Sequence, residues 1–225
     1  MAKKKENNIT SSFADGREQA IRIGLFGASG TGKTYRANQL AQTCRRLIIF
    51  DPLGEFARGE GAQVYDNLRS LSAAIRNNWR KGFRFVFLPT WGNEEKALAA
   101  LSRVIINLQT PYNMGASNTK ITLLVDELDL SFPCFARMRD RTTPFGFLCN
   151  RGRHYGVNLI GISQRPAQVD ICFRANLSSV YFFRLAEPAD FDAAIKMLGR
   201  DWTGVLRSLK DRQYIYKNGG FTCLK

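Results

Sequence analysis

A glycine-rich run of eight residues reads GASGTGKT and fits the pattern G-x-x-x-x-G-K-[ST]. Glycines let backbone N–H groups wrap around phosphate oxygens, and a following helix adds its positive end. The lysine is expected to reach the β- and γ-phosphates of ATP, and the last hydroxyl to bind Mg²⁺. The sequence therefore predicts a nucleotide-binding loop made of Gly27, Ala28, Ser29, Gly30, Thr31, Gly32, Lys33 and Thr34.

A pair of carboxylates follows an apolar run further along the chain. Ile121–Val125 reads ITLLV, and Asp126 and Glu127 come directly after it. Open α/β folds bind ligands at the edge where their strands end, which is where such a pair would lie. Asp126 is expected to hold Mg²⁺ together with Thr34 or through water, and Glu127 to polarise the attacking water. By itself the carboxylate pair is a weak signal of a catalytic site. It becomes a strong signal because a strand that leads into a phosphate-binding loop precedes it in the same domain.

The next apolar run, Val157–Gln164, ends in a polar side chain. If it is the next strand, Gln164 stands at the same ligand-binding edge as Asp126 and Glu127. From there its amide could hydrogen-bond the γ-phosphate or the attacking water.

Short apolar runs alternate with helical patterns from residue 21 onward, which is typical of a three-layer α/β fold with a mostly parallel sheet. Thr143 before Pro144 is a helix-start signal. A β-hairpin turning at Asn218-Gly219 is expected at the end of the chain. The predicted strands are 21–27, 47–51, 84–89, 121–127, 157–164, 180–185, 213–217 and 221–224. The predicted helices are 33–43, 69–80, 94–109, 144–154 and 188–198.

Lys and Arg outnumber Asp and Glu by 33 to 19, a formal net charge of +14 in 225 residues. Such an excess favours a polyanionic partner, because each phosphate that a protein neutralises releases counterions. The five cysteines show no C-x-x-C spacing and His154 is the only histidine, so a zinc site is not expected. Residues 1–19 are predicted to be a flexible basic tail and residues 20–225 a single domain. No run is apolar for long enough to span a membrane, and a cytoplasmic location is expected.

Five motifs in this order resemble the FtsK–HerA superfamily of DNA-pumping ATPases. They are GASGTGKT, LIIFDPLGEF, ITLLVDE, RGRHYGVNLIGISQRP and ICFRANLSSVYFFRL, and together they run from about residue 21 to the terminal hairpin. Asp51-Pro52-Leu53-Gly54-Glu55 is similar to the D-P-x-G-E turn of HerA-type members.

The resemblance implies a RecA-like P-loop NTPase core of the ASCE type, in which the Gln164 strand lies between the P-loop strand and the Asp126 strand. It also implies a ring, expected to be hexameric, whose sites lie between subunits. An arginine of one subunit would then stabilise charge on the transferring phosphoryl group in its neighbour. Arg153 matches the family's arginine before the sensor strand, and Arg151 is the second candidate.

The chain has the size of a motor domain with no flanking domains. In this it is similar to one subgroup, the genome-packaging ATPases of tailless, membrane-containing double-stranded DNA viruses. We therefore expect ATP-driven translocation of double-stranded DNA into a capsid, in the host cytoplasm or at a packaging vertex of the virion. Capsid or portal-vertex proteins are the further partners that this function implies.

Two basic clusters are candidates for contact with the DNA backbone. A motor that ignores base sequence needs phosphate contacts, so no recognition motif is expected. Ordinary solvated basic faces are the alternative for both clusters. The clusters are Arg137, Arg139 and Arg141, and Arg80, Lys81 and Arg84.

Two alternatives remain open from the sequence. One is another motor on the same core, either a plasmid or chromosome translocase or the assembly ATPase of a filamentous phage. The other is a P-loop protein that is not a motor, such as a nucleotide kinase, a GTPase or a nucleic-acid-binding module. The N-K-x-D guanine motif of GTPases is missing, and DNA-stimulated turnover would separate motors from the rest.

Overall fold

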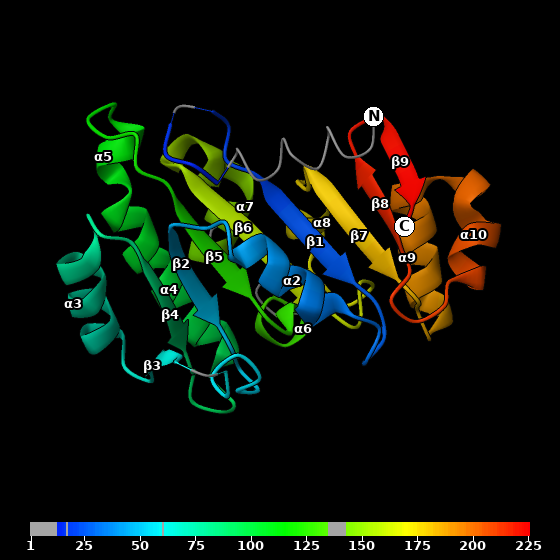
Figure 1. The fold of residues 1–225 in the computed structure, drawn as a ribbon, viewed down its shortest axis with the longest axis horizontal. Helices are drawn as coiled ribbons and strands as arrows, with labels where there is room; N and C mark the ends of the chain where they lie inside the picture. The colour runs from blue at the N-terminus through cyan, green and yellow to red at the C-terminus, as the bar shows by residue number, and fades with distance from the viewer. Residues whose placement is uncertain (1–12, 17, 60, 135–142) are drawn as a thin grey trace.

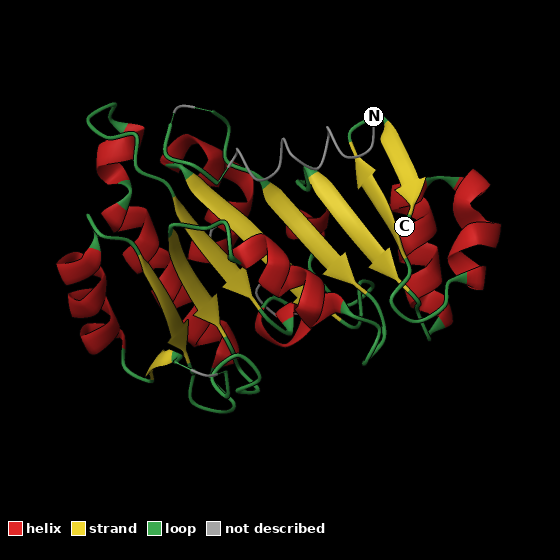
Figure 2. Cartoon of the chain, in the orientation of Figure 1, coloured by secondary structure: helices red, strands yellow, loops and turns green. Residues whose placement is uncertain are grey.

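A nine-stranded sheet lies at the centre of the computed structural model, which describes residues 13–16, 18–59, 61–134 and 143–225 (Figures 1 and 2). The strand order is β3-β4-β2-β5-β6-β1-β7-β8-β9. Pairing is parallel from β3 to β7 and antiparallel from β7 to β9. The strands are β1 (Arg22–Phe26), β2 (Arg46–Phe50), β3 (Gln63–Tyr65), β4 (Phe83–Phe87), β5 (Ile121–Val125), β6 (Val157–Ser163), β7 (Ser179–Phe183), β8 (Tyr214–Asn218) and β9 (Phe221–Leu224).

This strand order confirms the predicted fold class. β6, which precedes Gln164, lies between β5, which precedes Asp126, and β1, which precedes the glycine-rich loop. All five residues of β1, β2 and β5 are buried, as parallel strands covered on both faces require. The terminal hairpin pairs antiparallel with β7, so it extends the parallel sheet.

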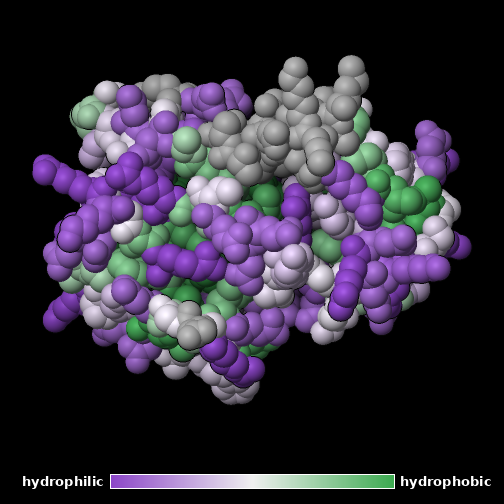
Figure 3. All heavy atoms as spheres, in the orientation of Figure 1, coloured by the Kyte–Doolittle hydropathy of each residue, from purple (hydrophilic) through white to green (hydrophobic). Residues whose placement is uncertain are grey.

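Helices cover both faces of the sheet (Figure 1). One apolar cluster lies on the α2 face and the other on the face of α3, α4, α7, α8 and α9, so the chain has the predicted three layers. Hydrophilic side chains dominate the face that carries α2 (Figure 3). The helices are α2 (Lys33–Ala41), α3 (Leu68–Asn78), α4 (Glu94–Leu108), α5 (Thr110–Asn113), α6 (Leu128–Ser131), α7 (Pro144–Arg151), α8 (Ile171–Arg174), α9 (Pro188–Leu198) and α10 (Thr203–Ser208), with 3₁₀ helices η1 (Gly152–Tyr155) and η2 (Arg200–Trp202).

Local signals account for the start and end of α7. Thr143 caps this helix, since its Oγ1 accepts a hydrogen bond from Gly146 N at 3.1 Å, and Pro144 occupies the first turn. The predicted helix 144–154 was too long, because the α-helix ends at Arg151 and the tighter η1 follows. Gly156, which follows the last residue of η1, has a left-handed backbone with φ 64°, and β6 begins at the next residue.

Several short elements were not predicted. β3 is three residues long and half exposed at the sheet edge, so it carries no apolar alternation. The helices α5, α6 and α8 have four residues each, which is about one turn and too short for a helical period to be read.

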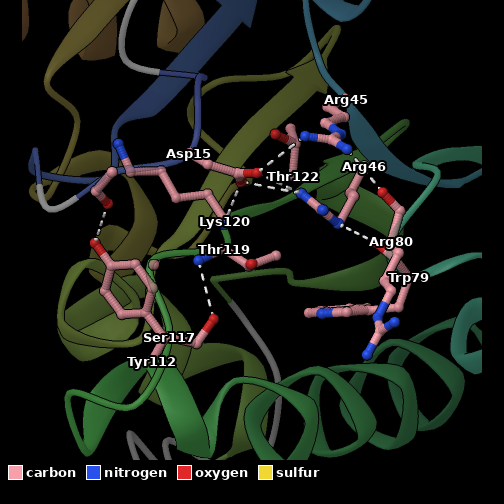
Figure 4. Close-up of polar contacts among 12 residues, drawn as sticks. Asp15, Arg45, Arg46, Trp79, Arg80, Tyr112, Ser117, Thr119, Lys120 and Thr122 are labelled. Atoms are coloured by element: carbon pink, nitrogen blue, oxygen red, sulfur yellow. Dashed lines mark hydrogen bonds and ion pairs between the residues drawn. The ribbon is translucent and has the colours of Figure 1, made fainter.

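Residues 13–16 pack against the edge of the sheet where the strands begin, although the sequence pattern assigned them to the tail. Phe13 is 3% exposed, and the Asp15 carboxylate accepts hydrogen bonds from Arg46 Nη1 at 3.0 Å and from Lys120 N at 2.9 Å (Figure 4). Arg46 also donates to Trp79 O at 2.7 Å and lies 5.4 Å from the centre of the Trp79 ring. The buried guanidinium of Arg46 is therefore paired with the Asp15 carboxylate and with the Trp79 carbonyl. Because Asp15 also accepts from Lys120, just before β5, residues 13–16 are held against β2 and β5.

Among the described helices, none has the combined length and apolar character that crossing a bilayer demands.

Candidate active site

The glycine-rich loop lies between the end of β1 and the start of α2. Its backbone is fixed by the two neighbouring strands, because Gly27 N donates to Ser163 O at 3.3 Å and Ala28 N to Arg184 O at 2.8 Å. Gly32 precedes α2 with φ 108°, a conformation that side chains rarely adopt. A Cβ on Gly27 would stand 2.6 Å from Phe183 Cβ, so the loop also needs glycine there for close packing. The loop therefore presents its N–H groups and the α2 N-terminus at the edge where the parallel strands end.

Lys33 lies folded over the loop and only 7% exposed. Its Nζ donates to Ala28 O at 2.8 Å, and the Thr31 hydroxyl donates to the same carbonyl at the same distance. Burial lowers the pKa of Lys33, and the carboxylates of Glu127 and Asp126 act in the opposite direction. The positively charged side chain of Lys33 therefore lies against the glycine-rich loop, the position expected for a lysine that binds phosphate.

Asp126 follows β5 and is 3% exposed. Its backbone N donates to Phe50 O at 2.9 Å, which fixes it to the neighbouring β2. Within the described part of the chain, Asp126 Oδ2 is buried with no hydrogen-bond partner. Burial, and then the charge of Glu127, raises the pKa of Asp126 to about 7. A buried carboxylate oxygen without a partner is a position that a cation would satisfy.

Glu127 and Gln164 are in direct contact. Gln164 Nε2 donates to Glu127 Oε1 at 2.6 Å, although 37 positions separate the two residues. Glu127 has a left-handed backbone with φ 40°, which costs a residue other than glycine free energy. Burial raises the pKa of Glu127, and the bond from Gln164 opposes that rise. The sheet order explains the contact, since β5 and β6 are adjacent and parallel.

These groups line one cavity of about 330 Å³. Residues predicted from the sequence supply most of its wall, and three more, Tyr35, Glu55 and Ile162, were not predicted as site residues. Tyr35, at 71% exposure, extends the loop side, and Glu55 enters from the segment after β2. Glu55 was visible in the sequence only as part of the D-P-x-G-E turn. The lining residues are Ser29, Gly30, Gly32, Lys33, Thr34, Tyr35, Glu55, Asp126, Glu127, Ile162 and Gln164.

The oxygen atoms of Thr34 and Asp126 fit a hard divalent cation such as Mg²⁺. Both residues line the cavity, and the unpartnered Oδ2 of Asp126 supplies a charged ligand. Among the described residues, no group of three or more His, Cys, Asp or Glu side chains forms a metal site of its own. Mg²⁺ commonly takes one or two protein oxygens and completes its shell with phosphate and water.

The two arginines proposed to act in the site of a neighbouring subunit lie where the parallel strands begin, whereas the cavity lies where these strands end. Arg151 ends α7 and Arg153 lies in η1, just before β6 begins, and both are exposed. Arg153 Nε donates to His154 Nε2 at 3.3 Å. Because β6 has seven residues at about 3.3 Å each, roughly 23 Å of sheet separates its two ends. Neither arginine reaches the cavity of its own chain.

One of the two basic clusters can be placed. Arg137, Arg139 and Arg141 lie outside the described residues. Arg80 and Lys81 are exposed in the turn before β4, where the strands begin, and Arg45 joins them by donating to Arg80 O at 2.7 Å. Arg84 instead bonds Asn38 of α2 through Nη2 at 2.9 Å, and burial lowers its pKa. Arg84, which is also exposed, is thus held toward α2, and the structure adds Arg45 to Arg80 and Lys81 from 35 positions away in the sequence.

We expect Asp126→Asn to stabilise the nucleotide-free protein at pH 8. A folded-state pKa of about 7 against an ordinary 3.8 means that the folded chain holds this proton more tightly than the unfolded chain. Stability is therefore lost as pH rises from about 4 to 7, and a neutral amide removes that loss. The melting temperature should rise by at least about 3 °C at pH 8, and by less at pH 5. Asp192→Asn, at an exposed position, is the control. An equal rise at both pH values would contradict the assignment.

No protein-family model matches the sequence, and no curated protein matches it either. Solved structures do share its fold. The genome-packaging NTPase B204 of Sulfolobus turreted icosahedral virus 2, solved with AMPPCP, is similar with a TM-score of 0.71, 14% identity and coverage of 91% of this chain and 96% of B204. The DNA-packaging ATPase B204 of Sulfolobus turreted icosahedral virus gives 0.69, 15%, 94% and 98%. VirB4 of Thermoanaerobacter pseudethanolicus gives 0.55, 14%, 95% and 91%. All three are at most 15% identical to this chain, so the likeness confirms its fold, which it shares with two genome-packaging proteins and with VirB4.

Proposed function

We propose that the chain is an Mg²⁺-dependent ATPase that uses ATP hydrolysis to move double-stranded DNA. In this proposal, copies of the chain form a ring, and the movement of DNA packages a viral genome. The observation that carries the proposal is the convergence of three separate segments on one cavity. The glycine-rich loop, Asp126, Glu127 and Gln164 come from three different strand ends and line the same space. The packaging NTPases with the same fold support the choice of function.

In this proposal each side chain acts on the triphosphate from its place in the cavity. Lys33 leaves Ala28 O and binds the β- and γ-phosphates, while the N–H groups of the loop hold the rest of the chain of phosphates. Thr34 and Asp126 would hold Mg²⁺, which neutralises charge on the phosphates when bound. Glu127 orients and polarises the attacking water.

Gln164 is proposed to link the γ-phosphate to Glu127. In the structure its amide donates to Glu127 Oε1 at 2.6 Å, so one acceptor position of this oxygen is taken. An amide has two N–H donors and a bound γ-phosphate offers strong acceptors, so nucleotide can draw Gln164 toward itself. That movement would release Glu127 only when ATP is present.

The basic character of the chain supports a nucleic-acid partner. The net charge of +14 and the exposed Arg80, Lys81 and Arg45 suit phosphate contacts without base readout. VirB4, a protein of the same fold, keeps a second candidate open, namely a motor of the same core that serves a system other than packaging.

The test is DNA binding and DNA-stimulated ATPase activity across a salt series, with two duplexes of unrelated sequence. We expect equal affinity for both duplexes and a loss of about 10³-fold between 50 and 200 mM salt if six phosphates are contacted. Replacing Arg80 and Lys81 together by alanine should reduce the slope of log affinity against log salt by about two. Arg200→Ala, an exposed arginine outside both clusters, is the matched control. A flat salt response, or ATPase activity that DNA does not change, would rule out the DNA motor.

A further inference from the structure

Glu55 reaches the cavity because a buried carboxylate builds the turn that carries it. Asp51 is fully buried after β2, and its backbone N donates to Phe87 O at 3.0 Å. Its Oδ1 accepts from Glu55 N at 3.0 Å and its Oδ2 from Ala57 N at 2.8 Å. Gly54, with φ 73°, allows the chain to turn between them. Both oxygens of Asp51 are thus used to place Glu55.

The sheet brings this turn beside the catalytic carboxylates. β2 and β5 are adjacent and parallel, with Phe50 opposite Val125, so the segments that follow them leave at the same edge. Glu55 therefore lies on the β2 side of Asp126 and Glu127, while Gln164 lies on the β6 side. Glu127 is in contact with an amide from the β6 side, and the segment after β2 supplies a carboxylate to the same cavity.

The charge of Glu55 acts on the same groups. Lys33 is shifted downward in pKa by burial, and the charges of Glu127, Asp126 and then Glu55 oppose that shift. The pKa values of Asp126 and Glu127 are raised mainly by burial, and Glu55 adds to both rises. Among the described residues, no hydrogen bond or ion pair of its side chain ties the Glu55 carboxylate to the protein. The Glu55 carboxylate is therefore a charged hydrogen-bond acceptor that lines the cavity and can bind a molecule inside it.

We propose that Glu55 is a second catalytic carboxylate, which accepts a hydrogen bond from the attacking water and fixes its orientation together with Glu127. In the step, the water oxygen forms a bond to the γ-phosphorus. The bond from that phosphorus to the bridging oxygen breaks, and its electron pair leaves with ADP. One water proton passes to Glu127 and then to the released phosphate, and the other hydrogen is the one that Glu55 holds. This role rests on the proposed ATPase function.

Glu55→Gln tests the role, because the amide keeps the size of the side chain and removes its charge. We expect kcat to fall about 10- to 100-fold while ATP affinity stays within about twofold. The melting temperature should not fall, since the turn is held by Asp51. Glu95→Gln, an exposed glutamate outside the cavity, is the charge-matched control and should turn over at the wild-type rate.

A double variant separates a shared water from two independent effects. If Glu55 and Glu127 orient the same water, Glu55→Gln combined with Glu127→Gln should be slower than Glu127→Gln alone by less than about threefold, because residues that act as a unit are not additive. Multiplied effects, a wild-type rate in Glu55→Gln, or a loss confined to ATP affinity would each overturn the role of Glu55 and leave the ATPase function standing. A wild-type chain that binds no ATP would overturn both.

Discussion

Replacing Glu127 by glutamine is expected to give a chain that binds ATP and hydrolyses it at least about 10²-fold more slowly than wild type. The glutamine keeps the size of the side chain and removes the charge that polarises the attacking water. Its amide can still meet Gln164, so the cavity wall is expected to keep its shape. The measurement is single-turnover hydrolysis beside equilibrium binding of ATP.

Lys33→Ala is the contrasting variant for this experiment. Lys33 lies folded over the loop at 2.8 Å from Ala28 O, and its loss removes the only cation among the described residues that line the cavity. We expect Lys33→Ala to lose nucleotide binding itself, whereas Glu127→Gln loses only the rate. Hydrolysis by Glu127→Gln at the wild-type rate would show that the water is activated elsewhere.

Arg153→Ala is expected to lower kcat by about 10³-fold while ATP affinity is nearly unchanged, because an arginine finger acts mainly in the transition state. The exposed Arg153 stands before β6, at the edge of the sheet opposite the cavity. A catalytic effect of this residue therefore requires the cavity of a neighbouring copy.

Mixing two inactive variants tests that requirement directly. Arg153→Ala chains keep an intact glycine-rich loop, and Lys33→Ala chains keep Arg153. Combined in one ring, they should form some composite sites and recover turnover that neither variant has alone. Rings that assemble from both variants and stay inactive would exclude Arg153, and Arg151, two positions earlier at the end of α7, would then be tested in the same way. Full activity in a monomeric chain with DNA present would end the inter-subunit mechanism altogether.

Much of the fold could be predicted from the sequence, because its strands are short, apolar and buried on both faces. LIIF is apolar throughout and ITLLV has one polar residue, Thr122, so neither run alternates as a one-sided strand would. The predicted bounds of β2 and β5 lie within two residues of those observed. The helix α9 begins and ends where its pattern predicted, with Pro188 at its start and Gly199 after its end. Short elements such as β3 and α6 left no periodic signal, so only the tertiary structure revealed them.

The sequence by itself also predicted the glycine-rich loop, Asp126, Glu127 and Gln164 as site residues, because the loop motif has a fixed spacing and strand-end polar residues share one edge of a parallel sheet. The structure brings these residues to one cavity. Only the tertiary structure decided which distant groups meet. It brought Gln164 against Glu127, placed Glu55 in the cavity through the buried Asp51, and set Arg153 at the far edge. Those contacts depend on the order of strands in the sheet, and strand order arises from the packing of the whole chain, which local composition and spacing do not encode.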